Sequence, residues 1–216
     1  VRENTEGMYS GIEKEFPDHV EAIRVISRKG CERILEFGFS LAKDLGEKKV
    51  TIVHKANILR KSCGLFRDIA FEVQKKFPGI EIEEVLVDAM AMRLVKHPEN
   101  FKVIVTTNLF GDILSDEAVQ LAGGLGLAPS ANIGKTNAVF EPIHGSAPKY
   151  AGKGIANPIA CILAGKMMLE YLGGKKLAEK ISNAVHKTLQ EGKFLPQDLN
   201  GKSSTKEVTN AIISNL

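Results

Sequence analysis

Apolar and polar positions along the chain switch repeatedly between strand-like and helix-like spacing. The runs at residues 49–54, 81–87 and 102–106 are short and largely apolar, as expected for strands buried in a sheet. Elsewhere apolar residues recur every three or four positions, which predicts helices. These cover residues 27–45, 64–77, 89–95, 113–122, 159–172, 175–191 and 205–214. Strands that alternate with helices predict an α/β layered fold with parallel strand pairs.

Three further segments complete the predicted elements. Strand-like runs, one after residue 2 and one over residues 20–27, predict a hairpin whose exposed edge would need a partner. A short strand is predicted at 138–141. The glycine-rich passage 123–129 is predicted to be a tightly packed turn. It does not match the dinucleotide-binding fingerprint, because a helix precedes it and Pro129 stands where the third glycine would be.

Composition narrows the classes of protein. The 216 residues carry a net charge of +3 with both signs interspersed, so we expect no nucleic-acid partner. Three widely spaced cysteines without a CxxC pair favour a reduced cytoplasmic compartment over a disulfide framework. No segment has the apolar length of a membrane span. The chain begins at Val1 inside a dense polar run, from which we expect that upstream residues are missing.

Charged residues gather where the predicted strands end. Lys55, Asp88 and Asp112 each follow one of three consecutive strands, at the sheet edge where α/β proteins bind ligands. Asp112 and Asp116 are four residues apart and would share one helix face, where like charges raise each other's pKa unless a cation lies between them. Taken singly, Lys55 could be a solvated surface lysine and Asp88 a helix cap, and Asp112 and Asp116 could be surface or capping aspartates. Together they favour a metal or ligand site.

The segment from His144 to Tyr150 is a loop rich in small residues. Such a loop, opening onto the helix at 159–172, can present backbone N–H groups to a phosphate. A single histidine in a loop of this kind is more often structural than catalytic, so the role of His144 stays open on pattern alone.

Five segments carry a family resemblance, in the order 2–11, 54–57, 87–89, 108–116 and 144–158. The chain resembles the metal-dependent β-decarboxylating dehydrogenases, which include isocitrate, 3-isopropylmalate and homoisocitrate dehydrogenases. The resemblance runs from Val1 to Leu216. It implies an isocitrate/isopropylmalate dehydrogenase-like fold with two α/β domains, the N-terminal part being missing. Residues 1–122 would form the small domain, with a dimerisation arm at about 8–27, and residues 123–216 the C-terminal part of the large cofactor-binding domain.

The resemblance also implies roles for single residues. Arg2 would clamp a substrate carboxylate, which suits a bidentate guanidinium, and Asn57 would lie near the substrate. Tyr9 would protonate the carbon left after CO₂ departs. Lys55 would take the proton of the substrate hydroxyl group.

A metal site shared between subunits is implied as well. Asp112 and Asp116 would bind the metal with Asp88 from a partner chain, and Lys55 would reach the partner's site too. The enzyme would therefore be an obligate homodimer. Three carboxylates suit Mg²⁺ or Mn²⁺ better than zinc.

The cofactor residues implied by the resemblance lie in the second half of the chain: His144, Gly145, Ser146, Ala147, Lys149, Tyr150 and Asn157. NAD-using members typically carry an acid and an aliphatic residue where this chain has Lys149 and Tyr150. A lysine there favours a 2′-phosphate, so we expect NADP, with NAD as the alternative. The tail at 194–201 shows no counterpart of the Tyr and Arg that some NADP enzymes add.

The expected reaction is NADP-dependent oxidative decarboxylation of a 2-hydroxy acid, with isocitrate to 2-oxoglutarate favoured by Lys149, Tyr150 and the run 8–13. The alternative is a 3-isopropylmalate or homoisocitrate dehydrogenase using NAD. A non-catalytic regulatory subunit is a rival of another class, but such subunits usually lose the tyrosine, the lysine or a metal carboxylate, and all are present here. A further possibility is that the 216 residues alone are inert.

Overall fold

The computed structural model describes residues 1–216. The chain divides into two compact units, Val1–Ala118 and Val119–Leu216, and each is described by itself. The assignment of residues 1–122 to a small domain and of 123–216 to part of a large domain stays a prediction.

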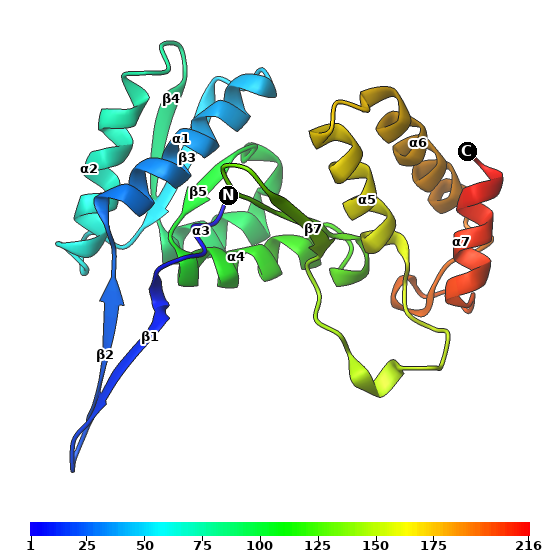
Figure 1. Ribbon diagram of the computed structural model, residues 1–216, viewed down its shortest axis with the longest axis horizontal. Helices are drawn as coiled ribbons and strands as arrows, with labels where there is room; N and C mark the ends of the chain where they lie inside the picture. The colour runs from blue at the N-terminus through cyan, green and yellow to red at the C-terminus, as the bar shows by residue number, and fades with distance from the viewer. The chain divides into compact units, whose positions relative to one another are not determined.

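The first unit is built on a three-stranded parallel sheet (Figure 1). Its strands are β3 (Lys49–His54), β4 (Glu81–Leu86) and β5 (Ile104–Thr106), in the order β4-β3-β5. The predicted parallel pairing is confirmed. Neighbouring residues of β3 point to opposite faces, so Ile52 and Val53 belong to different apolar clusters.

Helices cover both faces of this sheet, so apolar side chains are buried on both sides of the central strand β3, whereas the edge strand β4 carries Glu81, Glu83 and Glu84. On one face α1 (Arg28–Asp44) and α2 (Ser62–Gln74) contribute Leu35, Phe39, Phe66 and Ile69 to the larger cluster. On the other face α3 (Val87–Lys96) and α4 (Asn108–Leu121) contribute Met90, Leu94 and Leu114. A short 3₁₀ helix, η1 (Pro98–Asn100), leads from α3 toward β5.

The predicted hairpin is present. Strands β1 (Gly7–Glu15) and β2 (Val20–Val25) pair antiparallel and extend away from the sheet (Figure 1). Large apolar side chains are exposed along it: Tyr9, Ile12, Phe16, Val20, Ile23 and Val25. An apolar ribbon of two strands is marginally stable alone, so the expectation of a partner for this hairpin stands as a prediction.

Three helices begin earlier than the sequence predicts. Helix α2 starts at Ser62 instead of residue 64. Helix α4 starts at Asn108 instead of residue 113, so Asp112 lies in its second turn. Gly111 in its first turn leaves room for Arg2, because a Cβ there would lie 2.6 Å from Cγ of Arg2. Helix α3 starts at Val87, which places Asp88 inside its first turn and not at its cap.

The second unit packs three helices and a two-stranded sheet. Strands β6 (Pro129–Ile133) and β7 (Ala138–Pro142) pair antiparallel. Helices α5 (Ile159–Tyr171), α6 (Lys175–Glu191) and α7 (Thr205–Ser214) share a small core that includes Ile159, Val185, Val208 and Ile212.

Strand β6 was not predicted, because the proline and glycines beside it hide its short pattern. It follows the 3₁₀ helix η2 (Leu125–Leu127), which the tight turn at Gly123 and Gly124 precedes; both glycines have φ above +100°, a conformation that favours glycine. Two more 3₁₀ helices are η3 (Pro148–Tyr150) and η4 (Gln197–Leu199). No helix in the chain is long and apolar enough to span a membrane. The cytoplasmic location stays a prediction.

Candidate active site

Arg2, Tyr9 and Asp112 form one hydrogen-bonded group in the first unit. Arg2 bridges to Thr106, so the chain start lies beside β5 and directs the guanidinium over α4. Nη1 of Arg2 donates to Oδ1 of Asp112 at 2.5 Å, and the Tyr9 hydroxyl donates to Oδ2 of the same carboxylate at 2.6 Å. The guanidinium carbon also lies 5.0 Å from the centre of the Tyr9 ring. Residues about 100 positions apart are thus brought into direct contact.

The electrostatics of this group keep the tyrosine protonated. The hydrogen bond to the Asp112 carboxylate raises the pKa of Tyr9 above its ordinary value, and the charge of Asp112 acts in the same direction. The Arg2 guanidinium opposes this shift but does not cancel it. Tyr9 therefore has the state that a proton donor needs.

Asn108 is a site residue that sequence reasoning missed. Its side chain is buried, and its Oδ1 accepts hydrogen bonds from Nε and Nη2 of Arg2 at 3.0 and 2.7 Å. Its Nδ2 donates to the carbonyl of Glu6. Asn108 therefore fixes the plane of the Arg2 guanidinium. The available signal was its position as the first residue of the 108–116 motif.

Lys55 and Asp88 form a second charged pair in the same unit. Nζ of Lys55 lies 2.6 Å from Oδ1 of Asp88, and this hydrogen bond holds the pKa of the Asp88 carboxyl below its usual range. The lysine side chain is 24% exposed and the aspartate 65%. The predicted convergence of Lys55 and Asp88 is thus observed, whereas Asp112 is bonded to Arg2 and Tyr9. Asn57 is exposed in the turn after Lys55.

The predicted metal ligands are only partly assembled within one chain. Asp112 and Asp116 lie on α4, with Asp116 exposed, but no three His, Cys, Asp or Glu side chains of the chain gather into a metal-binding group. The donor set nevertheless fits a hard cation, because it consists of carboxylate oxygens. The Arg2 guanidinium occupies Oδ1 of Asp112 and stands in for such a cation.

The second unit contains a pocket of about 590 Å³ where the cofactor residues were predicted. His144, Gly145, Ala147, Tyr150 and Asn157 line it, together with Leu125, Gly126, Ile155, Ala156, Gln197 and Asp198. Ser146 and Lys149 do not line it. The Lys149 ammonium instead lies 4.9 Å from the centre of the Tyr150 ring.

Polar groups of this pocket are held by neighbours in the same unit. Asn157 accepts the backbone N–H of Ile159 at its Oδ1, which caps α5, and donates from Nδ2 to Oδ2 of Asp198 at 2.9 Å. Nδ1 of His144 lies 2.9 Å from the carbonyl of Gly145. Asp198 was not predicted, since it comes from η4 far along the chain, and nothing in its local pattern marks it.

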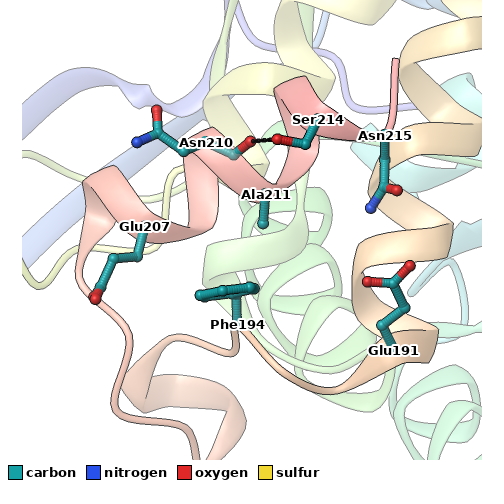
Figure 2. Close-up of a pocket in the computed structure, with 7 residues that line it drawn as sticks. All are labelled: Glu191, Phe194, Glu207, Asn210, Ala211, Ser214 and Asn215. Atoms are coloured by element: carbon teal, nitrogen blue, oxygen red, sulfur yellow. Dashed lines mark hydrogen bonds between the residues drawn. The ribbon is translucent and has the colours of Figure 1, made fainter.

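A second hollow, of about 300 Å³, lies between α6 and α7 (Figure 2). Figure 2 shows Phe194 at its base between the carboxylates of Glu191 and Glu207. Glu207 accepts from the backbone N–H and hydroxyl of Ser204 in a capping box, and Asn215 donates to Thr188. These groups stabilise helix ends, and the hollow carries no catalytic pattern.

Comparisons with known proteins agree with the predicted family. Residues 1–212 match the family model described as isocitrate/isopropylmalate dehydrogenase. A 3-isopropylmalate dehydrogenase from Archaeoglobus fulgidus is 55% identical over 99% of this chain and 65% of that protein. A homoisocitrate dehydrogenase from Methanocaldococcus jannaschii is 53% identical over 99% of this chain and 61% of that protein.

The fold prediction is confirmed by solved structures. The crystal structure of isocitrate dehydrogenase from Methylococcus capsulatus matches with a TM-score of 0.93 and 48% identity, over 99% of this chain and 65% of that one. The chain spans 65% or less of the length of the curated relatives that it matches. By its sequence and its fold, the chain belongs to the isocitrate/isopropylmalate dehydrogenase family.

Proposed function

We propose that this chain forms part of an enzyme for NAD(P)-dependent, metal-dependent oxidative decarboxylation of a 2-hydroxy acid. The observation that carries the proposal is the group of Arg2, Tyr9 and Asp112. It joins an anion-binding guanidinium, a protonated phenol and a carboxylate within hydrogen-bond distance of one another.

Arg2 and Tyr9 perform different steps in this proposal. Arg2 exchanges its bond to Asp112 for a carboxylate of the substrate, held in a fixed plane by Asn108. Tyr9 is released from Asp112 at the same time, and its phenol donates a proton to the carbon from which CO₂ has departed. The bond to Asp112 raises the pKa of Tyr9 and so keeps the phenol protonated until substrate arrives.

The bond to Asp88 holds the Lys55 ammonium at the end of β3 before substrate arrives. To act as a base, Lys55 must first lose its ammonium proton to solvent. Its neutral amine then accepts the proton of the substrate hydroxyl group, either directly or through one water molecule, while the hydride leaves the carbon that carries this hydroxyl. Asp88 would no longer bind Lys55 if its carboxylate held a cation. We propose that Lys55 and Asp88 serve the site of a partner subunit, so that the active enzyme is a homodimer.

The cofactors supply what the side chains cannot. A divalent cation such as Mg²⁺ or Mn²⁺, bound by Asp112, Asp116 and Asp88 of the partner subunit, supplies positive charge beside the substrate hydroxyl. The nicotinamide cofactor supplies the hydride acceptor, with its adenosine part in the pocket of His144, Tyr150 and Asn157.

Among the possible substrates we place 3-isopropylmalate first, homoisocitrate second and isocitrate third. Lys149, Tyr150 and the run 8–13 favour isocitrate on sequence alone. The names of similar relatives support the alternative better, because 3-isopropylmalate dehydrogenases from Archaeoglobus fulgidus and Methanothermobacter thermautotrophicus are 55% and 53% identical. A probable isocitrate dehydrogenase subunit from Drosophila melanogaster is 46% identical.

The cofactor proposal remains NADP, with NAD as the alternative. Its support is the ammonium of Lys149 beside Tyr150, since a nearby cation attracts a 2′-phosphate.

The test is a set of assays of the full-length protein with each of the three acids, both nucleotides and Mg²⁺. We expect 3-isopropylmalate to give the highest kcat/KM. Turnover of isocitrate alone would overturn the order of substrates. A lack of turnover with every acid would refute the proposed activity.

A further inference from the structure

Arg24 is a partly buried arginine that none of the steps above uses. It lies on β2 of the hairpin, and its guanidinium contacts two other segments of the first unit, the starts of α2 and α4. Nη2 donates to Oγ1 of Thr107 at 2.8 Å, and Nη1 lies 3.1 Å from Sγ of Cys63 and 3.4 Å from Oγ of Ser62. Its carbon Cζ lies 4.9 Å from the centre of the Phe110 ring.

The partners of Arg24 set it apart from other arginines of this unit. Arg2, Arg28, Arg33, Arg67 and Arg93 each pair with a carboxylate, and Arg60, which does not, is exposed to solvent. Arg24 forms no salt bridge, and its contacts are hydroxyls, a thiol and an aromatic face. A guanidinium that is partly removed from water and bonded only to neutral groups is held for its geometry, because a carboxylate would neutralise it at lower cost.

The first segment that Arg24 holds is the turn that carries Lys55. Cys63 is fully buried at the start of α2, and its sulfur accepts the backbone N–H of Lys55 at 3.3 Å. The same sulfur contacts Nη1 of Arg24. One sulfur atom therefore connects the guanidinium to the backbone of the proposed proton acceptor.

The second segment is the start of α4. Thr107 and Phe110 flank Asn108, which orients Arg2, and Asp112 follows in the next turn. Arg24 bonds the residue before the helix and covers the ring in its first turn. It therefore fixes the helix end on which the Arg2–Asp112 pair depends.

Strand β2, which carries Arg24, pairs with the strand that carries Tyr9. The register of the hairpin shifts because Gly7 pairs with Val25 and Ile12 with Ile23, so residues 8–11 bulge opposite Arg24. A bulge re-aims side chains, and here it lets Tyr9 reach Asp112.

We propose that Arg24 is a positioning residue whose guanidinium ties the start of α4 to Cys63 and so to the Lys55 turn, and thereby anchors β2, the strand that lies opposite the Tyr9 bulge. The effect on catalysis rests on the proposed function. The contacts of Arg24 with Cys63, Thr107 and Phe110, which we call the clamp, are a property of the first unit alone. Arg24 touches no reacting atom and acts through the segments that it joins.

The test is Arg24→Ala in the full-length protein, with Arg28→Ala as the matched control. Arg28 is an exposed arginine of α1 that pairs with Glu72. We expect Arg24→Ala to lower kcat about 30- to 100-fold, since small misplacements of reacting groups have effects of this order. KM for the nucleotide should change less than about twofold, because the pocket at residues 125–198 is separate. Millimolar guanidinium ions should restore part of kcat in Arg24→Ala and none in Arg28→Ala.

Amide hydrogen exchange separates this inference from the proposed function. In Arg24→Ala the amide of Lys55 and those of residues 107–112 should exchange faster than in wild type, whether or not any substrate is turned over. Arg24→Lys would keep the positive charge but lose the planar set of guanidinium N–H donors. Its kcat should therefore be only slightly higher than that of Arg24→Ala.

Three results would overturn the clamp: wild-type kcat and exchange in Arg24→Ala, a loss of kcat equal to the loss of folded protein without guanidinium rescue, or the same effects in Arg28→Ala. If the wild type turns over none of the acids, the proposed function fails. The clamp would then be rejected only if the amide of Lys55 exchanged at the same rate in Arg24→Ala and in wild type.

Discussion

The two compact units hold their proposed site residues in different ways. In residues 1–118 the charged groups pair with each other, as Arg2 does with Asp112 and Lys55 with Asp88. In residues 119–216 no proposed cofactor residue forms a salt bridge. Lys149 lies against an aromatic ring, and His144 has only the carbonyl of its neighbour within hydrogen-bond distance.

This difference indicates two ways to prepare for a ligand. In the proposed reaction, ion pairs hold the charged side chains of the first unit in place until the substrate and the cation replace their partners. The unpaired cation of the second unit leaves its charge available to a phosphate. Changes in the first unit should therefore act mainly on kcat, on KM for the hydroxy acid and on the metal requirement, and changes in the second on KM for the nucleotide.

The largest effect is expected for Asp112→Asn. The change leaves the shape but removes the negative charge and one of the two oxygens that accept hydrogen bonds from Arg2 and Tyr9. Because metal charge is worth several kcal/mol in such reactions, kcat should fall at least about 100-fold and the Mg²⁺ concentration for half-maximal rate should rise. Asp68→Asn, which removes an exposed carboxylate paired with Arg67, should change neither quantity. An unaltered Mg²⁺ dependence in Asp112→Asn would rule out ligation there.

The next largest effect is expected for two glycine changes, one in each unit, which test whether the two units bind different ligands. At Gly111 a Cβ would lie 2.6 Å from Cγ of Arg2, and at Gly126 it would lie 2.7 Å from Nδ2 of Asn157. We expect Gly111→Ala to raise KM for the hydroxy acid about tenfold by displacing Arg2, and Gly126→Ala to raise KM for the nucleotide by a similar factor. Each variant should leave the other KM within about twofold.

The control for this pair is Gly165→Ala in α5, where an added Cβ meets no atom within 4 Å. It should leave both KM values unchanged and stabilise the helix slightly. Equal changes of both KM values in Gly111→Ala would contradict the assignment of hydroxy-acid binding to the first unit and nucleotide binding to the second.

Lys149→Asp should have a smaller effect, confined to the cofactor. Reversal of one charge beside a 2′-phosphate is worth roughly 1 kcal/mol, so the ratio of kcat/KM for NADP to that for NAD should fall about fivefold. The matched control is Lys153→Asp, whose ammonium lies 6.0 Å from the same Tyr150 ring. A ratio that does not move in Lys149→Asp removes this lysine from the cofactor site.

The smallest effect concerns pH and the buried His54, which precedes Lys55. Its Nδ1 accepts the backbone N–H of Ala56 at 3.1 Å, and its buried Nε2 makes no hydrogen bond, with Oε1 of Glu84 at 3.5 Å. Burial lowers the pKa of His54, and the charge of Glu84 opposes this only in part. The unfolded chain, where the pKa is about 6.5, therefore binds this proton more readily.

It follows that the contribution of His54 to stability is complete above about pH 6.5 and is lost as pH falls below it. Urea midpoints measured at pH 7.5 and 5.5 should show this loss in wild type. The loss should be smaller in His54→Gln and unchanged in His19→Gln, which alters an exposed histidine of the hairpin. Identical pH slopes in wild type and His54→Gln would contradict the prediction.

The sequence alone determined the elements and the kinds of chemistry. Short strand-like runs identified β3, β4 and β5, because each contributes apolar side chains to the clusters on the faces of the sheet. Five short motifs in one order carried the resemblance to the family. The start of α4 and the strand β6 were missed where glycine and proline obscure the periodic pattern.

Only the tertiary structure decided which residues meet. No local pattern states that Arg2 bonds Asp112 through a plane fixed by Asn108, or that Asp198 bonds Asn157. The same holds for Arg24. In the sequence it is one polar residue of a hairpin, and in the fold it joins β2 to the starts of α2 and α4. Local spacing sets secondary structure through neighbouring residues, whereas these contacts join positions up to about 110 residues apart and exist only once the chain has packed.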